Sequence, residues 1–257
     1  SIFLSLLNFL ISFLNSRFII NNVNIKLTKK SKDGTVKFLI SLCDKNIIEA
    51  VLIPTEKRIT ACISSQVGCS LDCDFCATAK IRRMRNLDFY EIFDQTMILN
   101  AESSKLFGRS ISNIVFMGMG EPLLNLINVV PAIKILLDNN AYNISHTRVT
   151  VSTAGVVPGI KKLSETTNVS LAVSLHAPTN HLRNSLVPLN KKYPLEILIN
   201  TCKEYLKQDT KKTVTFEYTL IKDINDSVEL ARILVKLVKP IKAKINLIPY
   251  NNVVGLS

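Results

Sequence analysis

The chain has 257 residues, of which 47% are hydrophobic and 20% are charged. These fractions exclude a disordered or collagen-like chain and predict a core for one large domain or two small ones. Lys and Arg total 32 against 20 Asp and Glu, a net charge of +12. This charge favours a polyanionic partner, nucleic acid first and a membrane surface second, although a compositional bias towards lysine would produce the same charge. The six cysteines are too few and too unevenly spaced for a disulfide scaffold.

The first 20 residues form the most apolar stretch of the chain, and Asn8, Ser12 and Arg17 interrupt it. No basic region precedes this stretch and no small-residue cleavage site follows it, so the pattern does not favour a signal peptide. Its unbroken apolar part is also shorter than the roughly 20 residues that a membrane-spanning helix needs. We expect an amphipathic helix that packs on a partner domain, and a cytoplasmic protein with reduced thiols and no membrane association.

Residues 26–54 alternate between apolar and polar side chains, with a hairpin turn signal at Asp33-Gly34, and predict a small β-meander. From residue 58 the pattern changes to short Val- and Ile-rich strands that alternate with helices, which is typical of a parallel sheet covered by helices. Pro194 lies in the first turn of one helix, and Asp226 begins the last helix, which ends before Pro240. The expected strands are 58–64, 113–118, 147–153, 169–176, 213–219 and 243–249, and the expected helices are 88–104, 127–139, 157–166, 194–207 and 226–239.

An array of this kind is either an open doubly wound sheet or a partial barrel. In both, functional sites lie at the carboxyl ends of the strands. Directly after the first of these strands, Cys69, Cys73 and Cys76 follow the spacing C-x3-C-x2-C, which predicts a soft-metal site. Three thiolates can hold three corners of a cubic 4Fe–4S cluster and leave the fourth iron open to a chelating ligand, and Phe75 would shield such a cluster from water. The alternative is a zinc site in which Cys62 supplies a fourth thiolate, although the chain has only one of the two C-x2-C pairs that such sites commonly use.

The cysteine triplet resembles the signature of the radical S-adenosylmethionine superfamily. Five further strings, in one order, resemble its dual-specificity RNA methyltransferase branch, the RlmN and Cfr type: MGMGEPLLN at 117–125, VTVSTAGVVP at 149–158, SLHAPT at 174–179, VPLNKKYP at 187–194 and INLIPYN at 245–251. The resemblance covers roughly residues 30–252. It implies an α/β fold, a partial (βα)6 radical-SAM barrel with a small N-terminal β-meander extension.

In proteins of this family the three cysteines hold one 4Fe–4S cluster, and the amino and carboxylate groups of S-adenosylmethionine chelate the open iron. The residue types agree with such a ligand, because Gly118 and Gly120 let the backbone approach closely and Glu121 offers a carboxylate to an ammonium group. The resemblance implies contacts to S-adenosylmethionine from a set of residues near strand ends: Gly120, Glu121, Ser152, Ser174, Leu175, His176 and Asn251.

The resemblance also assigns two residues to methyl transfer. Glu49 occupies the position of the family's proton acceptor, and Cys62 that of a cysteine that helps to resolve a covalent protein–RNA adduct. In the family scheme one S-adenosylmethionine methylates another cysteine near the C-terminus, and a second is cleaved to a radical that takes a hydrogen from the S-methyl group. This route is needed because the ring carbon of adenine is not a nucleophile. Without the resemblance, Glu49 would be interpreted as a surface carboxylate and Cys62 as a buried strand cysteine.

The chain departs from the family pattern at both ends. No cysteine follows Cys202, which falls inside a predicted helix and is interpreted as structural. We expect residues 1–25 to be a remnant of a helical accessory domain, 26–57 a small β extension, and 58–257 a barrel core without its C-terminal segment. We therefore expect this polypeptide to bind cluster and cofactor without turnover, and methylated adenine in a turnover assay would refute that expectation.

The sequence thus predicts a radical S-adenosylmethionine methyltransferase that methylates carbon 2 of an adenine in 23S rRNA and in tRNA, as a monomer with a flavodoxin-like electron donor. The alternatives are methylation of carbon 8 and a zinc- or cluster-bearing module that binds RNA without catalysis. Basic residues after the cysteine loop would hold RNA phosphates near the open iron, unless they form an ordinary solvated turn. These residues are Lys80, Arg82, Arg83 and Arg85.

Overall fold

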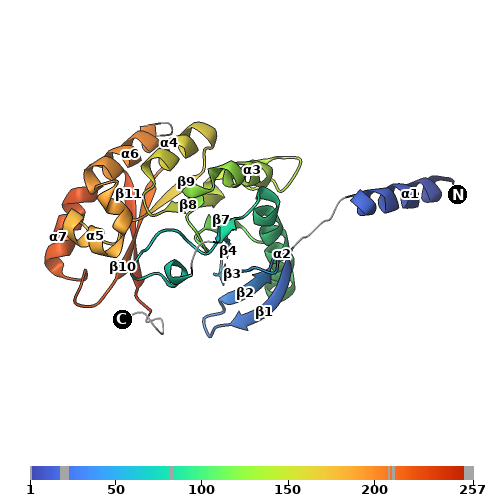
Figure 1. Ribbon diagram of the computed structural model, residues 1–257, viewed down its shortest axis with the longest axis horizontal. Coiled ribbons are helices and arrows are strands. Elements are labelled where there is room, and N and C mark those ends of the chain that lie inside the picture. Colours follow the sequence, from blue (N-terminus) through green and yellow to red (C-terminus); the bar gives the residue numbers. More distant parts are fainter. Residues whose placement is uncertain (1, 18–22, 82–83, 208, 210–211, 252–257) are drawn as a thin grey trace.

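The computed structural model describes residues 2–17, 23–81, 84–207, 209 and 212–251. Its centre is a nine-stranded sheet with the strand order β1-β2-β3-β4-β7-β8-β9-β10-β11. Figure 1 shows this sheet with helices packed around its outer side. Its strands are β1 (Asn24–Lys30), β2 (Val36–Ser41), β3 (Ile47–Pro54), β4 (Ile59–Cys62), β7 (Asn113–Phe116), β8 (Val149–Thr153), β9 (Ser170–Ser174), β10 (Val214–Leu220) and β11 (Ala243–Pro249).

The strands from β4 to β11 in this sheet are all parallel to their neighbours. Helices and turns connect them along the outer side, as expected for βα units. This arrangement confirms the predicted six-stranded partial barrel. The helices are α2 (Phe89–Phe107), α3 (Leu126–Leu137), α4 (Val157–Thr166), α5 (Asn180–Leu186), α6 (Leu195–Lys207) and α7 (Val228–Val238), with 3-10 turns at Ala77–Lys80, Pro122–Leu124, His146–Arg148 and Pro188–Lys191.

The predicted meander is present as β1, β2 and β3, which pair antiparallel. The strand β3 then pairs antiparallel with β4, the first barrel strand, so that Val51 lies opposite Cys62. Phe38, Ile48 and Leu52 are fully buried and give the extension a shared core with the barrel. The extension therefore continues the barrel sheet instead of standing beside it.

Two local features differ from the sequence prediction. The last helix begins after Asp226, because Ser227 caps it by accepting a hydrogen bond from the Leu230 N–H at 3.2 Å, while Asp226 accepts one from the Asp223 N–H. The helix α5 was not predicted, because seven residues are too few to display a helical period. Cys202 on α6 is buried in the core, as its structural interpretation requires.

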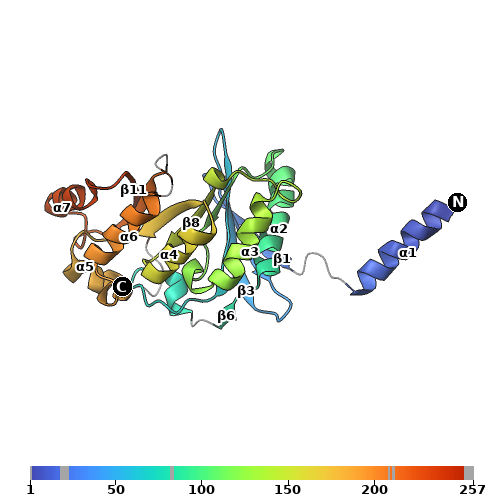
Figure 2. The same ribbon diagram turned by 90° about the horizontal axis from the view of Figure 1, so that it is seen from above.

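The N-terminal helix α1 (Ile2–Arg17) lies apart from the barrel in Figures 1 and 2. Within the part of the chain that the structure describes, no helix has the length and apolar character needed to cross a membrane. The predicted docking of this helix on a partner domain stays a prediction, and residues 18–22 and 252–257 of the predicted domains lie outside the described residues. The large apolar side chains that α1 exposes are Leu4, Leu6, Leu7, Phe9, Leu10, Ile11, Phe13 and Leu14.

Candidate active site

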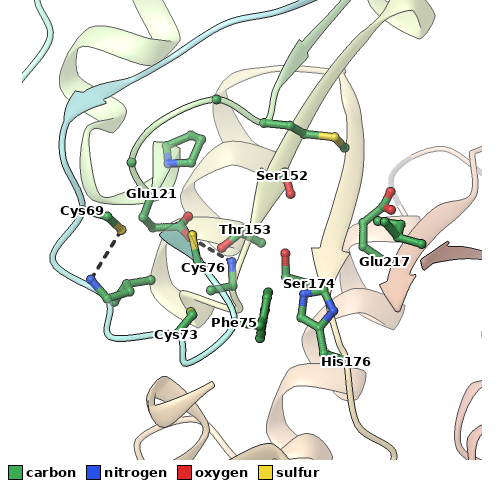
Figure 3. A pocket seen from close by; sticks show the side chains of 17 residues that line it. Cys69, Cys73, Phe75, Cys76, Glu121, Ser152, Thr153, Ser174, His176 and Glu217 are labelled. Carbon is green, nitrogen blue, oxygen red and sulfur yellow. Dashed lines mark hydrogen bonds between the residues drawn. The ribbon is translucent and has the colours of Figure 1, made fainter. Parts of the chain in front are cut away.

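A cavity of about 250 Å³ lies at the carboxyl ends of the parallel strands. Its lining comes from the cysteine loop (residues 68–81), from the turn after β7, from the ends of β8, β9 and β11, and from the middle of β10 (Figure 3). Segments far apart in the sequence therefore meet at one point. The predicted site residues that line this cavity are Cys69, Cys73, Cys76, Gly120, Glu121, Ser152, Ser174 and His176.

The cysteine loop leaves the short strand β5 (Gln66–Val67) and returns in β6 (Arg85–Asn86), which pairs with it. Within the loop, the Leu71 N–H donates to the Cys69 Sγ at 3.4 Å, and the Cys76 N–H donates to the Cys73 carbonyl at 3.2 Å. These local bonds form tight turns between the cysteines. As a result all three side chains line the same cavity, as Figure 3 shows.

The three thiols offer soft ligands to a metal centre in the cavity. Burial raises the pKa of the Cys73 thiol to about 12, and the neighbouring Cys76 and Cys69 add to this rise. Thiols of this kind release their protons when a cation binds. Among the described residues, no group of three or more His, Cys, Asp or Glu side chains is gathered closely enough to hold one metal ion. A cubic cluster places each thiolate on a different iron, so three thiols that line one cavity can each bind one of its corners.

Glu121 lies in the turn after β7 and supplies a carboxylate to the cavity. The residue is only 3% exposed. Its Oε1 accepts a hydrogen bond from the Leu123 N–H at 3.1 Å, and its Oε2 accepts one from the Ala154 N–H at 2.8 Å. Burial raises the pKa of Glu121 to about 7, against the opposing effect of these hydrogen bonds. A cationic ligand in the cavity would favour the carboxylate and lower that pKa.

Gly118 and Gly120 also line the cavity. The packing of the protein itself gives a second reason for glycine at these two positions. A Cβ on Gly120 would overlap the Cβ of Gln66, and a Cβ on Gly118 would lie 2.6 Å from the Oγ of Ser64. Gly120 also has a φ of +95°, which favours glycine. The two glycines therefore let the turn after β7 pack directly on the segment that leads into the cysteine loop.

Ser152, Ser174 and Glu217 project from one face of the sheet. In the register of the parallel strands, Ser152 lies opposite Ala172, and Ser174 lies opposite Glu217. Side chains of register partners, and of residues two apart on a strand, point to the same face. The Asn246 side-chain amide, one strand further, donates to Glu217 at 2.6 Å, and burial raises the pKa of this carboxyl group. The sequence prediction missed Glu217, although a carboxylate inside the apolar strand TVTFEYT was an available signal.

His176 follows β9 with a φ of +56° and is buried at the edge of the cavity. Its Nδ1 accepts a hydrogen bond from the Thr219 N–H at 3.0 Å, so the ring proton of the neutral imidazole is on Nε2. Burial, assisted by the nearby Arg183, lowers the pKa of His176 to about 3. The Phe75 ring packs against the imidazole with 4.4 Å between ring centroids. His176 is therefore a neutral, fixed hydrogen-bond donor beside the cysteine loop.

Leu175 and Asn251 do not belong to the residues that line the cavity. The Leu175 side chain is fully buried, and its backbone N–H donates to the Glu217 carbonyl at 3.0 Å. Asn251 is exposed at the end of the described chain, directly after the loop that follows β11. Their proposed contacts to S-adenosylmethionine stay predictions.

Glu49 and Cys62 lie on the sheet and are not among the residues that line the cavity. The Glu49 carboxylate pairs with the Lys37 Nζ at 2.8 Å. Cys62 is the last residue of β4, its thiol accepts a hydrogen bond from the Met117 N–H, and burial raises its pKa to about 12. Because Val51 is the register partner of Cys62 and lies two residues from Glu49, the two predicted residues share one face of the sheet.

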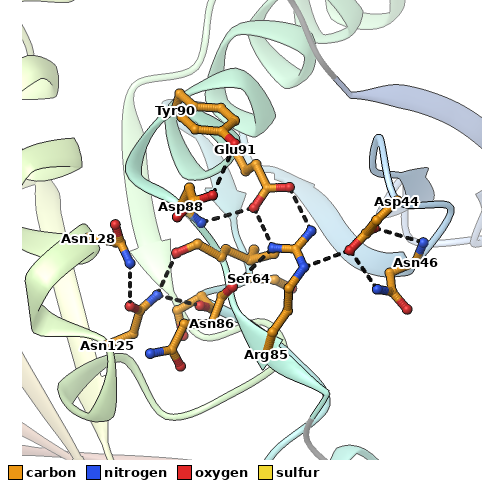
Figure 4. Close-up of polar contacts among 12 residues, drawn as sticks. Asp44, Asn46, Ser64, Arg85, Asn86, Asp88, Tyr90, Glu91, Asn125 and Asn128 are labelled. Carbon is orange, nitrogen blue, oxygen red and sulfur yellow. Dashed lines mark hydrogen bonds and ion pairs between the residues drawn. The ribbon is translucent and has the colours of Figure 1, made fainter.

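Arg85 occupies a polar network at the base of the cysteine loop (Figure 4). Its guanidinium donates to both oxygens of Glu91, at 2.7 and 2.8 Å, and its Nε donates to the Asp44 carboxylate at 2.6 Å. These two carboxylates neutralise its charge, which corrects the prediction that Arg85 holds RNA phosphates. Arg82 and Arg83, which were predicted to do the same, lie outside the described residues.

A parallel partial barrel with three loop thiols at the carboxyl ends of its strands defines a radical S-adenosylmethionine enzyme, a class that uses a 4Fe–4S cluster and S-adenosylmethionine. The family model described as the Radical SAM superfamily matches residues 63–234. A crystal structure of a radical SAM methyltransferase from Sphaerobacter thermophilus superposes with a TM-score of 0.89 at 40% identity, over 94% of this chain and 71% of that one. SuiB of Streptococcus suis, at 18% identity and a TM-score of 0.52, shares the fold alone.

Curated relatives refine this class. The probable dual-specificity RNA methyltransferase RlmN of Flavobacterium psychrophilum is 48% identical over 91% of this chain and 67% of its own length. The dual-specificity RNA methyltransferase RlmN of Saccharophagus degradans is 52% identical over 86% of this chain and 57% of its own length. The chain therefore belongs to the RlmN-type family of radical SAM RNA methyltransferases. It spans between 57% and 68% of the length of the first five relatives.

Proposed function

We propose that Cys69, Cys73 and Cys76 hold one 4Fe–4S cluster, with S-adenosylmethionine on the open iron, and that the protein methylates carbon 2 of an adenine in 23S rRNA and in tRNA. One observation carries this proposal. The three loop thiols, the Glu121 carboxylate and the Ser152 hydroxyl, which come from three separate segments, line a single cavity. The names of the RlmN relatives supply the RNA substrate class.

Different residues of the cavity would bind different groups of S-adenosylmethionine. Glu121 offers the anionic group for an ammonium, because its two hydrogen bonds to backbone N–H groups hold the carboxylate in place. Ser152 and Ser174 offer hydroxyl groups, and His176 offers its Nε2 proton, to the ribose or base. When bound and reduced, the cluster supplies the electron for reductive cleavage of S-adenosylmethionine, the chemistry needed to methylate a carbon that is not a nucleophile.

Glu49 and Cys62 complete the proposal as the proton acceptor and the thiol that resolves the protein–RNA adduct. Their common face of the sheet supports this pairing. The ion pair between Glu49 and Lys37 is half-exposed and therefore weak enough to open for a substrate. The Cys62 thiol is buried, so its reaction requires a neighbouring base or movement of the Met117 turn.

The net charge of +12 supports binding of RNA. Reduction of the cluster requires a low-potential one-electron donor, for which a flavodoxin-like protein is proposed. We further propose a cytoplasmic monomer. Methylation of carbon 8 is the alternative within the same chemistry.

The test begins with anaerobic reconstitution and analysis of iron and sulfide. We expect about one 4Fe–4S cluster per chain, and cleavage of S-adenosylmethionine to 5′-deoxyadenosine with a strong reductant. Replacement of Cys73 by Ala is expected to abolish both results, whereas the matched change of the exposed Cys43 leaves them intact. A colourless protein that binds one zinc through four thiols would refute the proposal. Mass analysis of adenine in 23S rRNA and tRNA from cells that make the natural full-length gene product distinguishes carbon 2 from carbon 8, whereas methylation by the 257-residue polypeptide would refute the expectation that it binds cluster and cofactor without turnover.

A further inference from the structure

Arg183 on α5 is a buried cation, with its residue only 1% exposed. Among the described residues, its guanidinium donates only to neutral oxygens: the carbonyls of Leu175, Ala154 and Ser174, and the Oδ1 of Asn190 at 2.9 Å. Within the described ranges of the chain, no carboxylate forms an ion pair with it. A charge withdrawn from water without an opposite charge is strongly disfavoured, so its retention points to an anion nearby.

The helix that carries Arg183 packs directly against the cysteine loop. The Asp74 N–H donates to the Leu186 carbonyl at 3.1 Å, and Cys73 packs on the small apolar cluster that contains Leu186 and Val187. Two of the carbonyls that the guanidinium binds belong to Ala154 and Ser174, which line the cavity together with Cys73. Burial lowers the pKa of Arg183 to about 10. The guanidinium therefore lies against residues of the same cavity that the cysteine loop lines.

We propose that Arg183 is the internal countercharge for the iron–sulfur cluster and its thiolate ligands. This inference rests on the proposed function, which places the cluster on the cysteine loop. A cubic cluster with three thiolates is anionic, and it becomes more negative when a low-potential donor gives it one electron. A fixed positive charge in a region of low dielectric constant stabilises the reduced state more than the oxidised state. Arg183 thus raises the reduction potential of the cluster and makes it easier to reduce.

A purely structural role would also explain some of these contacts, because the guanidinium ties together the ends of β8 and β9. The two roles are separable at Asn190, whose Oδ1 accepts one of the guanidinium hydrogen bonds. Asn190→Asp places a carboxylate at this oxygen and cancels the charge while Arg183 keeps its three carbonyl partners. Asn190→Ala removes the same amide contacts without adding a charge and is the matched control.

The measurement is a redox titration of the reconstituted protein, followed by electron paramagnetic resonance, with iron and sulfide content determined for each variant. We expect Asn190→Asp to move the midpoint potential to a more negative value than Asn190→Ala, which stays near the wild-type value. Arg183→Lys, which keeps the charge, is expected to stay nearer the wild type than Arg183→Gln. Arg109→Gln removes a guanidinium that also binds backbone carbonyls, but in the turn before β4, and is expected to leave the potential unchanged.

Equal potentials for Asn190→Asp and Asn190→Ala would overturn the inference, whether both shift or neither does. If Asn190→Asp fails to fold, the comparison of Arg183→Lys with Arg183→Gln decides, and equal potentials there also overturn it. A wild-type protein that assembles no cluster refutes the proposed function and the inference together. If the wild-type protein assembles the cluster but the variants show that its midpoint potential does not depend on the charge at Arg183, the inference alone is refuted.

Discussion

The guanidinium of Arg85 binds both carboxylate oxygens of Glu91, at 2.7 and 2.8 Å. Arg85 belongs to β6, the returning arm of the cysteine loop, and Glu91 lies in the first turn of α2. The same arginine also binds Asp44, between β2 and β3, so one side chain ties the loop to the helix and to the meander. The Glu91 side chain is only 5% exposed, so the ion pair with Arg85 is largely withdrawn from water on the side of Glu91.

Replacement of Arg85 by Met is expected to lower the free energy of unfolding of the cluster-free protein by about 2–4 kcal/mol, because it leaves Glu91 buried without its cation. Urea denaturation measures this loss. Lys105→Met breaks the exposed pair with Glu102 and is expected to change stability by less than about 1 kcal/mol. An equal effect of the two substitutions would show that the Arg85 network does not stabilise the fold.

Gly120 gives a second prediction, about how the turn after β7 supports the cysteine loop. Gly120→Ala would force a residue with a side chain to a φ of +95° and make its Cβ overlap that of Gln66. We expect a loss of about 2–4 kcal/mol and a reduced iron content, because displacement of Gln66 moves the start of the loop. Gly108→Ala is the matched control, since its φ is +65° with no atom within 4 Å of the new Cβ. It is expected to lose only about 1–2 kcal/mol and no iron.

The buried carboxyl group of Glu121 predicts a pH dependence of stability. Burial raises its pKa from 4.5 to about 7 in the folded state. A group whose pKa is raised on folding contributes stability that is complete below its unfolded pKa and is lost as the pH rises through its folded pKa. The stability of cluster-free Glu121→Gln relative to wild type is therefore expected to increase between pH 4.5 and pH 7, by on the order of 3 kcal/mol. Urea denaturation at a series of pH values tests this, with the exposed Glu229→Gln as baseline. A relative stability that does not change with pH would contradict the burial of an ionisable Glu121.

The sequence predicted the barrel because its strands are short runs of Val and Ile, and such runs are buried on both faces of a parallel sheet. The strand β8, for example, falls within the predicted 147–153. What it did not predict depends on pairing across the chain. The continuity of β3 with β4, the two-residue pairing of β5 with β6, and the partners of Arg85 all join segments whose proximity no local pattern expresses.

In the candidate site too, local motifs could be recognised in the sequence, whereas contacts between distant segments could not. The three cysteines and Glu121 carry local motifs from which the sequence predicts them, and all four line one cavity. Glu217 was missed because its importance arises only when β10 lies beside β9, which brings it opposite Ser174. Leu175 was included through a motif, but alternation along the chain directs its side chain into the core, away from the neighbouring Ser174.

The role of Cys62 gives the last prediction, because it separates a three-thiol cluster from a four-thiol zinc site. Cys62 does not line the cavity, and its thiol accepts a hydrogen bond from the Met117 N–H. Cys62→Ser keeps a group that can accept this bond, so we expect full iron and sulfide content and undiminished cleavage of S-adenosylmethionine. Cys73→Ser, the same change at a cavity-lining residue, is expected to lose the cluster and the cleavage together, because a serine hydroxyl is a poor iron ligand. Loss of metal in both variants would instead mean that Cys62 is a fourth ligand, and the open iron on which the proposed chemistry depends would not exist.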